Sequence, residues 1–176
     1  SLRGEEILSW RKNMLLKGGR KVDLDWLLDL SGGLDWGRLQ SLIIDPSRVL
    51  QLDSSLVELE DIWNKHLEKQ VPLQYLVGRC PWRDFELQIS SAALIPRQET
   101  EILVDLALKK VSNHKKGSWV DLGTGSGALA VALARSLPSW EGFAVELSEK
   151  AIDLAKKNLE RLAPSIEVSF LLGDWW

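Results

Sequence analysis

The sequence of 176 residues predicts an α/β protein in which a bundle of helices precedes a partial Rossmann-like core with three parallel strands. Up to about residue 77, apolar residues recur at the spacing of amphipathic helices. From about residue 118, short apolar runs alternate with amphipathic segments. Strands separated by helices form parallel sheets, because each crossover helix returns the chain to the same edge of the sheet.

The first 77 residues are expected to form a bundle of four helices, which glycine pairs and a proline separate. The expected helices lie around residues 7–15, 23–30, 35–44 and 56–67. Asp53 or Ser54 is expected to cap the fourth helix, because short side chains with an oxygen acceptor bind the free N–H groups of a first turn. No catalytic constellation is expected in this part of the chain.

Residues 78–95 are predicted to form a hairpin that links the bundle to the core, with Arg83 and Asp84 at its turn. The segment that starts at Leu94 is predicted to open a helix that runs to about Val111. A proline and two acidic residues in its first turn favour this start. The remaining residues, 96–176, are expected to form the core.

The core is predicted to be a βαβαβ unit. Its expected strands lie at residues 118–122, 142–146 and 167–172, and its expected helices at 128–137 and 149–162. Ser148 is expected to cap the second of these helices. Ligands of such folds bind at the carboxyl ends of the strands, so the residues that follow each strand are the candidates for a site.

The most informative stretch is the turn after the first of these strands. Gly123, Gly125 and Gly127 alternate there with Thr124 and Ser126, between an apolar run and an Ala-rich helix. Glycines at alternate positions allow a sharp turn and let a ligand approach the backbone. The free N–H groups of the following helix favour an anionic or strongly polar ligand.

Two cofactor classes fit this turn. Gly123, Gly125 and Ala128 also satisfy the dinucleotide fingerprint, so NAD is an alternative. Glu146, at the end of the second strand, can accept both hydroxyls of a ribose in either class. Asp121 favours S-adenosylmethionine, because an acid at this place reaches the charged amino-acid end of that cofactor, whereas dinucleotide enzymes usually carry an apolar residue.

The end of the third strand adds Asp174 and Trp175. Asp174 could accept a hydrogen bond from an adenine amino group, and Trp175 could stack on the ring. The alternative is a polar turn that surface aromatic residues happen to follow.

Composition limits the partners. The net charge of −3 does not favour broad binding to nucleic acid. The single cysteine, Cys80, cannot form an internal disulfide, which fits the reducing cytoplasm. No apolar run approaches the roughly 20 residues that cross a bilayer. Zinc-ligand spacing is absent from the sequence, so we expect no metal site.

Three motifs carry a resemblance to one family. They are Pro72–Gly78, Leu94–Glu101 and Asp121–Gly127. Together they resemble the successive signatures of the HemK/PrmC family of glutamine-N5 methyltransferases, which modify peptide chain release factors. The likeness runs through nearly the whole chain. Two residues depart from the family pattern, since Gln98 replaces a proline and Glu146 replaces an aspartate.

The resemblance implies S-adenosylmethionine as cofactor and the glutamine of a Gly-Gly-Gln loop in a release factor as substrate. The implied cofactor-binding residues are Arg97, Asp121, Gly123, Thr124, Gly125, Ser126, Gly127, Glu146, Asp174 and Trp175. The helical bundle would recognise the substrate. The Asn-Pro-Pro-Tyr motif that serves catalysis in the family is absent from the sequence, so we expect an inactive fragment with no catalytic residue of its own.

In the family's sheet order, a fourth strand lies beside the first. An exposed sheet edge is therefore expected in this chain, where it invites self-association. Two other classes of function remain open. One is an amino-methyltransferase that acts on nucleic acid, and the other is a non-catalytic module that binds a protein through the helical bundle.

Overall fold

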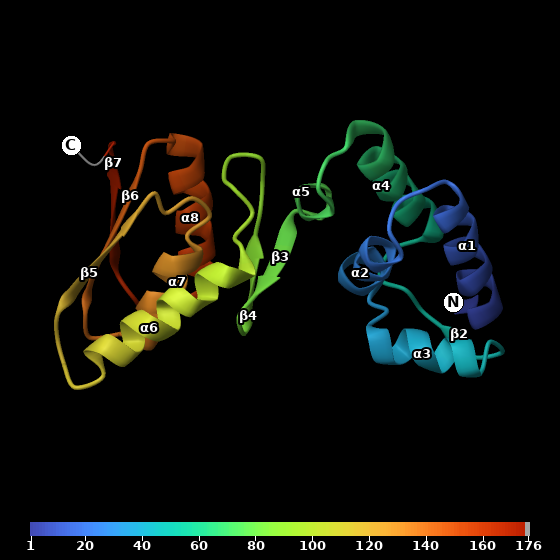
Figure 1. The fold of residues 1–176 in the computed structure, drawn as a ribbon, viewed down its shortest axis with the longest axis horizontal. Helices are drawn as coiled ribbons and strands as arrows, with labels where there is room; N and C mark the ends of the chain where they lie inside the picture. The colour runs from blue at the N-terminus through green and yellow to red at the C-terminus, as the bar shows by residue number, and fades with distance from the viewer. Residues whose placement is uncertain (175–176) are drawn as a thin grey trace. The chain divides into compact units, whose positions relative to one another are not determined.

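The computed structural model describes residues 1–174. The chain forms two compact units, Ser1–Val77 and Gly78–Trp176. The first unit is helical and the second contains the parallel sheet (Figure 1). No helix among the described residues is long and apolar enough to cross a membrane.

The helical unit contains the four expected helices and three elements that the sequence pattern did not predict. The helices are α1 (Gly4–Leu16), α2 (Lys21–Gly32), α3 (Trp36–Ile44), α4 (Leu56–Lys69) and the short α5 (Leu73–Val77). Strands β1 (Leu2–Arg3) and β2 (Val49–Leu50) pair antiparallel. These strands have two residues each, which is too short to leave a periodic pattern in the sequence.

The core of the helical unit combines apolar side chains from α1, α2, α3 and α4, among them Ile7 and Trp63. Trp63 is fully buried, and its Nε1–H donates to the carbonyl oxygen of Met14 at 3.2 Å. Gly19 closes the turn after α1 with a φ of +87°. A Cβ atom at Gly19 would lie 2.5 Å from Cζ2 of Trp63, so the indole packs directly against the backbone of this turn.

The cap of α4 corrects one expectation. Neither Asp53 nor Ser54 caps the helix; Ser55 does. The Ser55 Oγ accepts the backbone N–H of Glu58 at 3.3 Å, and the Glu58 carboxylate accepts the backbone N–H of Ser55 at 2.8 Å. Glu58 stands three residues after Ser55, and this reciprocal pair selects the cap among three neighbouring candidates.

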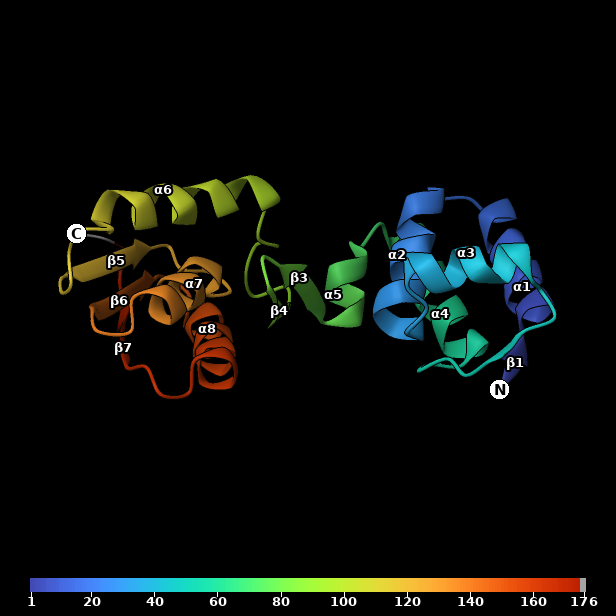
Figure 2. The same cartoon turned by 90° about the horizontal axis from the view of Figure 1, so that it is seen from below.

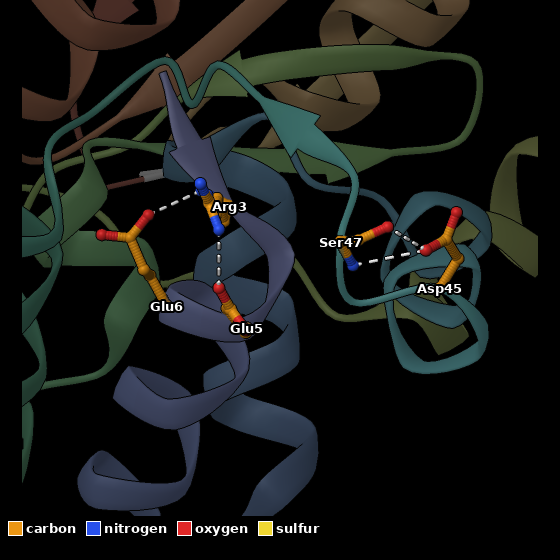
Figure 3. Close-up of polar contacts among 5 residues, drawn as sticks. All are labelled: Arg3, Glu5, Glu6, Asp45 and Ser47. Atoms are coloured by element: carbon orange, nitrogen blue, oxygen red, sulfur yellow. Dashed lines mark hydrogen bonds and ion pairs between the residues drawn. The ribbon is translucent and has the colours of Figure 1, made fainter.

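The N-terminus of α1 is closed by a loop that lies after α3. The N–H groups of Gly4 and Glu5 donate to the carbonyl oxygens of Arg48 and Pro46, at 2.7 and 2.9 Å. Figure 3 shows the side chains on both sides of this contact. The Glu6 carboxylate accepts the N–H of Arg3 at 2.7 Å, and Asp45 accepts the Ser47 hydroxyl at 2.6 Å. Two segments distant in the sequence thus satisfy the free donors of a helix start.

The second unit begins with the predicted hairpin. Strands β3 (Arg79–Trp82) and β4 (Phe85–Gln88) pair antiparallel, and Arg83 at the turn has a φ of +54°. The helix expected from Leu94 starts later: the 3-10 turn η1 (Gln98–Thr100) precedes α6 (Glu101–Val111). Pro96 accounts for part of this delay, because a proline disfavours helical geometry in the residue before it, here Ile95.

The predicted βαβαβ unit follows and is confirmed. Its elements are β5 (Ser118–Leu122), α7 (Ala128–Ser136), β6 (Glu141–Glu146), α8 (Glu149–Leu162) and β7 (Val168–Leu172). The strands are parallel in the order β5-β6-β7, and Ser148 caps α8 by accepting the N–H of Ala151. The carboxyl ends of all three strands therefore meet at one edge of the sheet.

One face of the sheet is covered and the other is not. Helices α7 and α8 pack against the covered face through Val131 and Leu159 (Figure 2). On the opposite face, Val120 and Leu122 of β5 are 54% and 51% exposed, and Leu171 of β7 is 51% exposed. Among the described residues, no strand pairs with the outer edge of β5.

We predict that the chain self-associates through this edge and face as its concentration rises. Exposed apolar strands at a sheet edge pair readily, because their N–H and C=O groups lack partners. Val120→Lys should lower the associated fraction in sedimentation velocity. Leu16→Lys, which alters an exposed leucine of α1 in the other unit, should leave it unchanged. An unaltered chain that stays monomeric at every concentration would contradict the prediction.

Candidate functional site

The glycine turn connects β5 to α7 at the carboxyl edge of the sheet. Gly123, Gly125 and Gly127 have φ angles of +79°, +55° and +82°, which L side chains rarely adopt. The N–H groups of Gly123 and Thr124 donate to the carbonyl oxygen of Val145, at 2.8 and 3.0 Å. These two hydrogen bonds fix the turn to the end of β6. The outer side of the turn leaves its backbone accessible to a ligand.

The inner side of the turn packs closely against α8. A Cβ atom at Gly127 would lie 3.0 Å from the Cβ and 3.1 Å from the Cα of Ala155. Ala155 is fully buried. A larger side chain at either position would push α7 and α8 apart, so the small residues set the distance between the two helices.

Asp121 is buried at the end of β5. Its Oδ2 atom accepts a hydrogen bond from the Thr124 hydroxyl at 2.7 Å. Burial raises the pKa of this carboxyl, and the charge of Glu146 raises it further, whereas the hydrogen bonds from Thr124 and from the backbone of Ala130 lower it. The turn thus contains a carboxylate that is costly to ionise and that a positive ligand group would stabilise.

Glu146 lies at the end of β6 and links the turn to α8. Its Oε2 atom accepts the N–H of Gly125 at 3.0 Å, and its Oε1 atom accepts the N–H groups of Leu147 and Ser148 at 2.9 and 3.1 Å. A carboxylate has about four lone-pair positions, so three are used and one remains on Oε2. Any hydroxyl groups that bind here must share the carboxylate with the backbone.

Asn158 of α8 is a structural residue of the site that sequence reasoning missed. Its side chain is fully buried, and its Oδ1 atom accepts the N–H of Gln88 at 2.7 Å. Its Nδ2 atom donates to the carbonyl oxygens of Gln88 and Ser126, each at 2.9 Å. One amide group thus joins the hairpin, the glycine turn and α8. The signal in the sequence was a lone asparagine in the apolar row of an amphipathic helix.

The contacts of Arg97 and Asp174 connect them less directly to the glycine turn than those of Asp121 and Glu146 do. The Trp82 indole donates to the carbonyl oxygen of Arg97 at 3.1 Å, which fixes the backbone there, but the exposed Arg97 side chain makes no described contact with the glycine turn. Asp174 is exposed beside the end of β6, since the N–H of Gly173 donates to the carbonyl oxygen of Glu146 at 3.0 Å. Trp175 lies outside the described residues.

Cys80 is buried, and burial together with the nearby charge of Glu86 raises the pKa of its thiol, which keeps it in the unreactive form. Within residues 1–174, no group of three His, Cys, Asp or Glu side chains could hold a metal ion.

Asp121→Asn should stabilise the chain near neutral pH. The pKa of Asp121 is higher in the folded protein than in the unfolded chain, so the folded state loses stability as pH rises from about 4 through the folded pKa. Thermal melts against pH should show a higher Tm for Asp121→Asn at neutral pH and a vanishing difference in acid.

Asp153→Asn is the matched control for this change, because Asp153 is exposed on α8. Its Tm should follow that of the unaltered chain at every pH. A lower Tm of Asp121→Asn at neutral pH would show that the ionised carboxylate stabilises the turn, contrary to the expected sign.

Asn158→Leu should destabilise the chain by about 3 kcal/mol, because it removes the partners of one donor and two acceptors that are partly or wholly buried. Urea unfolding would measure the change. Asn64→Leu, at a half-buried position of α4 in the other unit, should cost less than about 1 kcal/mol. Equal effects of the two variants would argue against a special role of Asn158.

The comparisons with known proteins agree with the motifs. Residues 96–174 match the family model described as methyltransferase small domain. The chain is 62% identical over 174 residues to the release factor glutamine methyltransferase of Prochlorococcus marinus. This match covers 98% of this chain and 59% of that protein. It is 42% identical to the same enzyme of Gloeobacter violaceus, over 88% of this chain and 52% of that protein.

Among solved structures, the N-terminal domain of human METTL16 is 16% identical, with a TM-score of 0.41 over 87% of this chain and 55% of that one. The chain spans about half to three fifths of the length of the curated relatives named above. The resemblance that the three motifs carried is confirmed, because the chain is similar along nearly its whole length to release factor glutamine methyltransferases.

Proposed function

We propose that this chain forms the S-adenosylmethionine-binding part of an enzyme that methylates the side-chain nitrogen of a glutamine in a peptide chain release factor. The observation that carries the proposal is the pairing of two carboxylates with an open glycine turn. Asp121 lies beneath the turn, and Glu146 closes it from the neighbouring strand. The names of the relatives supply the substrate class.

Each part of the cofactor has a counterpart at this edge. The backbone from Gly123 to Gly127 would cradle the amino-acid end, whose positive ammonium group Asp121 would attract directly or through water. Glu146 would accept the ribose hydroxyls. Asp174 would receive the adenine amino group, with Trp175 stacked on the ring and Arg97 at the rim.

Bound S-adenosylmethionine supplies an activated methyl group, because the positive sulfur leaves as a neutral thioether. The cofactor would supply this methyl group to the glutamine nitrogen, while the glycine turn, Asp121 and Glu146 would hold the cofactor in place for the transfer. Such a reaction depends on positioning, which can contribute several kcal/mol. The residues named here would hold the cofactor rigidly. We propose no proton transfer to or from any of them.

The helical unit, residues 1–77, would recognise the protein substrate. It has its own buried core, so it can present a fixed surface. We place the enzyme in the cytoplasm, because a release factor acts there in translation.

Calorimetric titration with S-adenosylhomocysteine tests the cofactor site, with NAD as the competing ligand class. We expect selective binding of S-adenosylhomocysteine. Glu146→Ala should weaken it at least tenfold, since a lost hydrogen bond to a charged group costs roughly 1.5–3 kcal/mol. Asp121→Asn should also weaken it while the fold stays intact.

Glu141→Ala is the matched control, because Glu141 is an exposed acid at the opposite end of the same strand. Its affinity should equal that of the unaltered chain. Tighter binding of NAD than of S-adenosylhomocysteine, or equal binding by all variants, would refute the proposed site.

A further inference from the structure

A cavity of about 520 Å³ lies between α2 and α3 in the helical unit, remote in sequence from the glycine turn. Val22 and Trp26 of α2 and Trp36 and Leu39 of α3 line it. Val22 is 63% exposed and Trp36 is 62% exposed. Large apolar side chains that stay exposed around a concave surface are typical of a binding site.

The polar residues of this cavity decide which ligand it suits. Asp25 is already neutralised, because Arg11 holds both its oxygens at 2.6 and 2.9 Å. Asp29 lies one helical turn further along the same row of α2 and is exposed. Among the described residues, none forms an ion pair or hydrogen bond with its carboxylate. The cavity therefore offers one uncompensated negative charge next to indole rings.

The positive residue of the lining does not cancel that charge. Lys21 lies eight residues before Asp29 on α2, which is about 12 Å along the helix axis. This distance exceeds the Debye length of about 8 Å at physiological salt. A cation beside Asp29 would therefore be screened from Lys21.

We propose that the cavity between α2 and α3 binds an arginine side chain on the surface of the protein substrate. The guanidinium group would stack on the indole of Trp36 or Trp26 and pair with the carboxylate of Asp29. Arginine suits this site better than lysine, because its planar group can stack on an aromatic face and bond a carboxylate with two N–H groups at once. The inference rests on the proposed role of the helical unit in recognising a release factor.

The first test needs no release factor. N-acetyl-arginine amide is titrated into the chain, and the indole N–H signals of the tryptophans are followed by NMR. We expect saturable shifts of the Trp26 and Trp36 signals, which Asp29→Asn abolishes. The matched ligand is N-acetyl-citrulline amide, which has nearly the same shape and no charge. Equal shifts with citrulline, or none with arginine, would overturn the proposed ligand class.

The second test measures binding of a purified, unmethylated release factor to the same chain by calorimetry. Trp36→Ala and Asp29→Asn should each weaken binding about tenfold. The affinity of the unaltered chain should fall as salt rises from low to physiological levels, and Asp29→Asn should reduce this dependence. Two exposed positions outside the cavity serve as controls: Ile44→Ala on α3 and Glu68→Gln on α4 should change binding less than twofold.

The outcomes separate this inference from the proposed function. Normal binding of the release factor by Trp36→Ala and Asp29→Asn would overturn the arginine site and leave the enzyme assignment intact. No binding by the unaltered chain would overturn recognition of a release factor by this chain, and with it the occupant proposed for the cavity. In that case, S-adenosylhomocysteine binding would still support the cofactor site.

Discussion

The left-handed backbone of three glycines constrains the whole carboxyl edge of the sheet. The glycine turn can expose its backbone to a ligand only if other groups hold it from behind, and the structure provides two such supports. The carbonyl oxygen of Val145 binds two of its N–H groups, and the Asn158 amide binds the carbonyl oxygen of Ser126. Because both supports are buried or lie between strands, the turn is set before any ligand arrives, which lowers the entropic cost of binding.

Glu146 holds the structure together, and in the proposed site it would also bind the cofactor. Its carboxylate accepts three backbone N–H groups, from the glycine turn and from the start of α8. The carboxylate of this residue reaches back to the N–H of Gly125 at 3.0 Å. A ligand with two hydroxyl groups has to displace or share some of these bonds, so the affinity of the site depends on the balance between them.

In the proposed function, the two units would divide the work between cofactor binding and substrate recognition. The unit with the sheet carries the buried acid Asp121 and the glycine turn, whereas the helical unit carries exposed tryptophan next to an unpaired carboxylate. The two units thus differ in the kind of ligand that their surfaces suit. A cofactor needs a rigid, partly buried cradle, while a large protein partner needs a few exposed anchors on a stable helical surface.

Local patterns in the sequence determined the order of the longer helices and of the strands from residue 79 onward, the hairpin turn and the glycine turn, because periodic apolar residues and glycines act within a few positions. They also pointed to Asp121 and Glu146 by their places at strand ends. Only the tertiary structure decided that Glu146 folds onto Gly125 and that Asn158 binds Gln88, seventy residues away. These contacts join segments far apart in the chain, and their energy depends on burial, which no local pattern encodes.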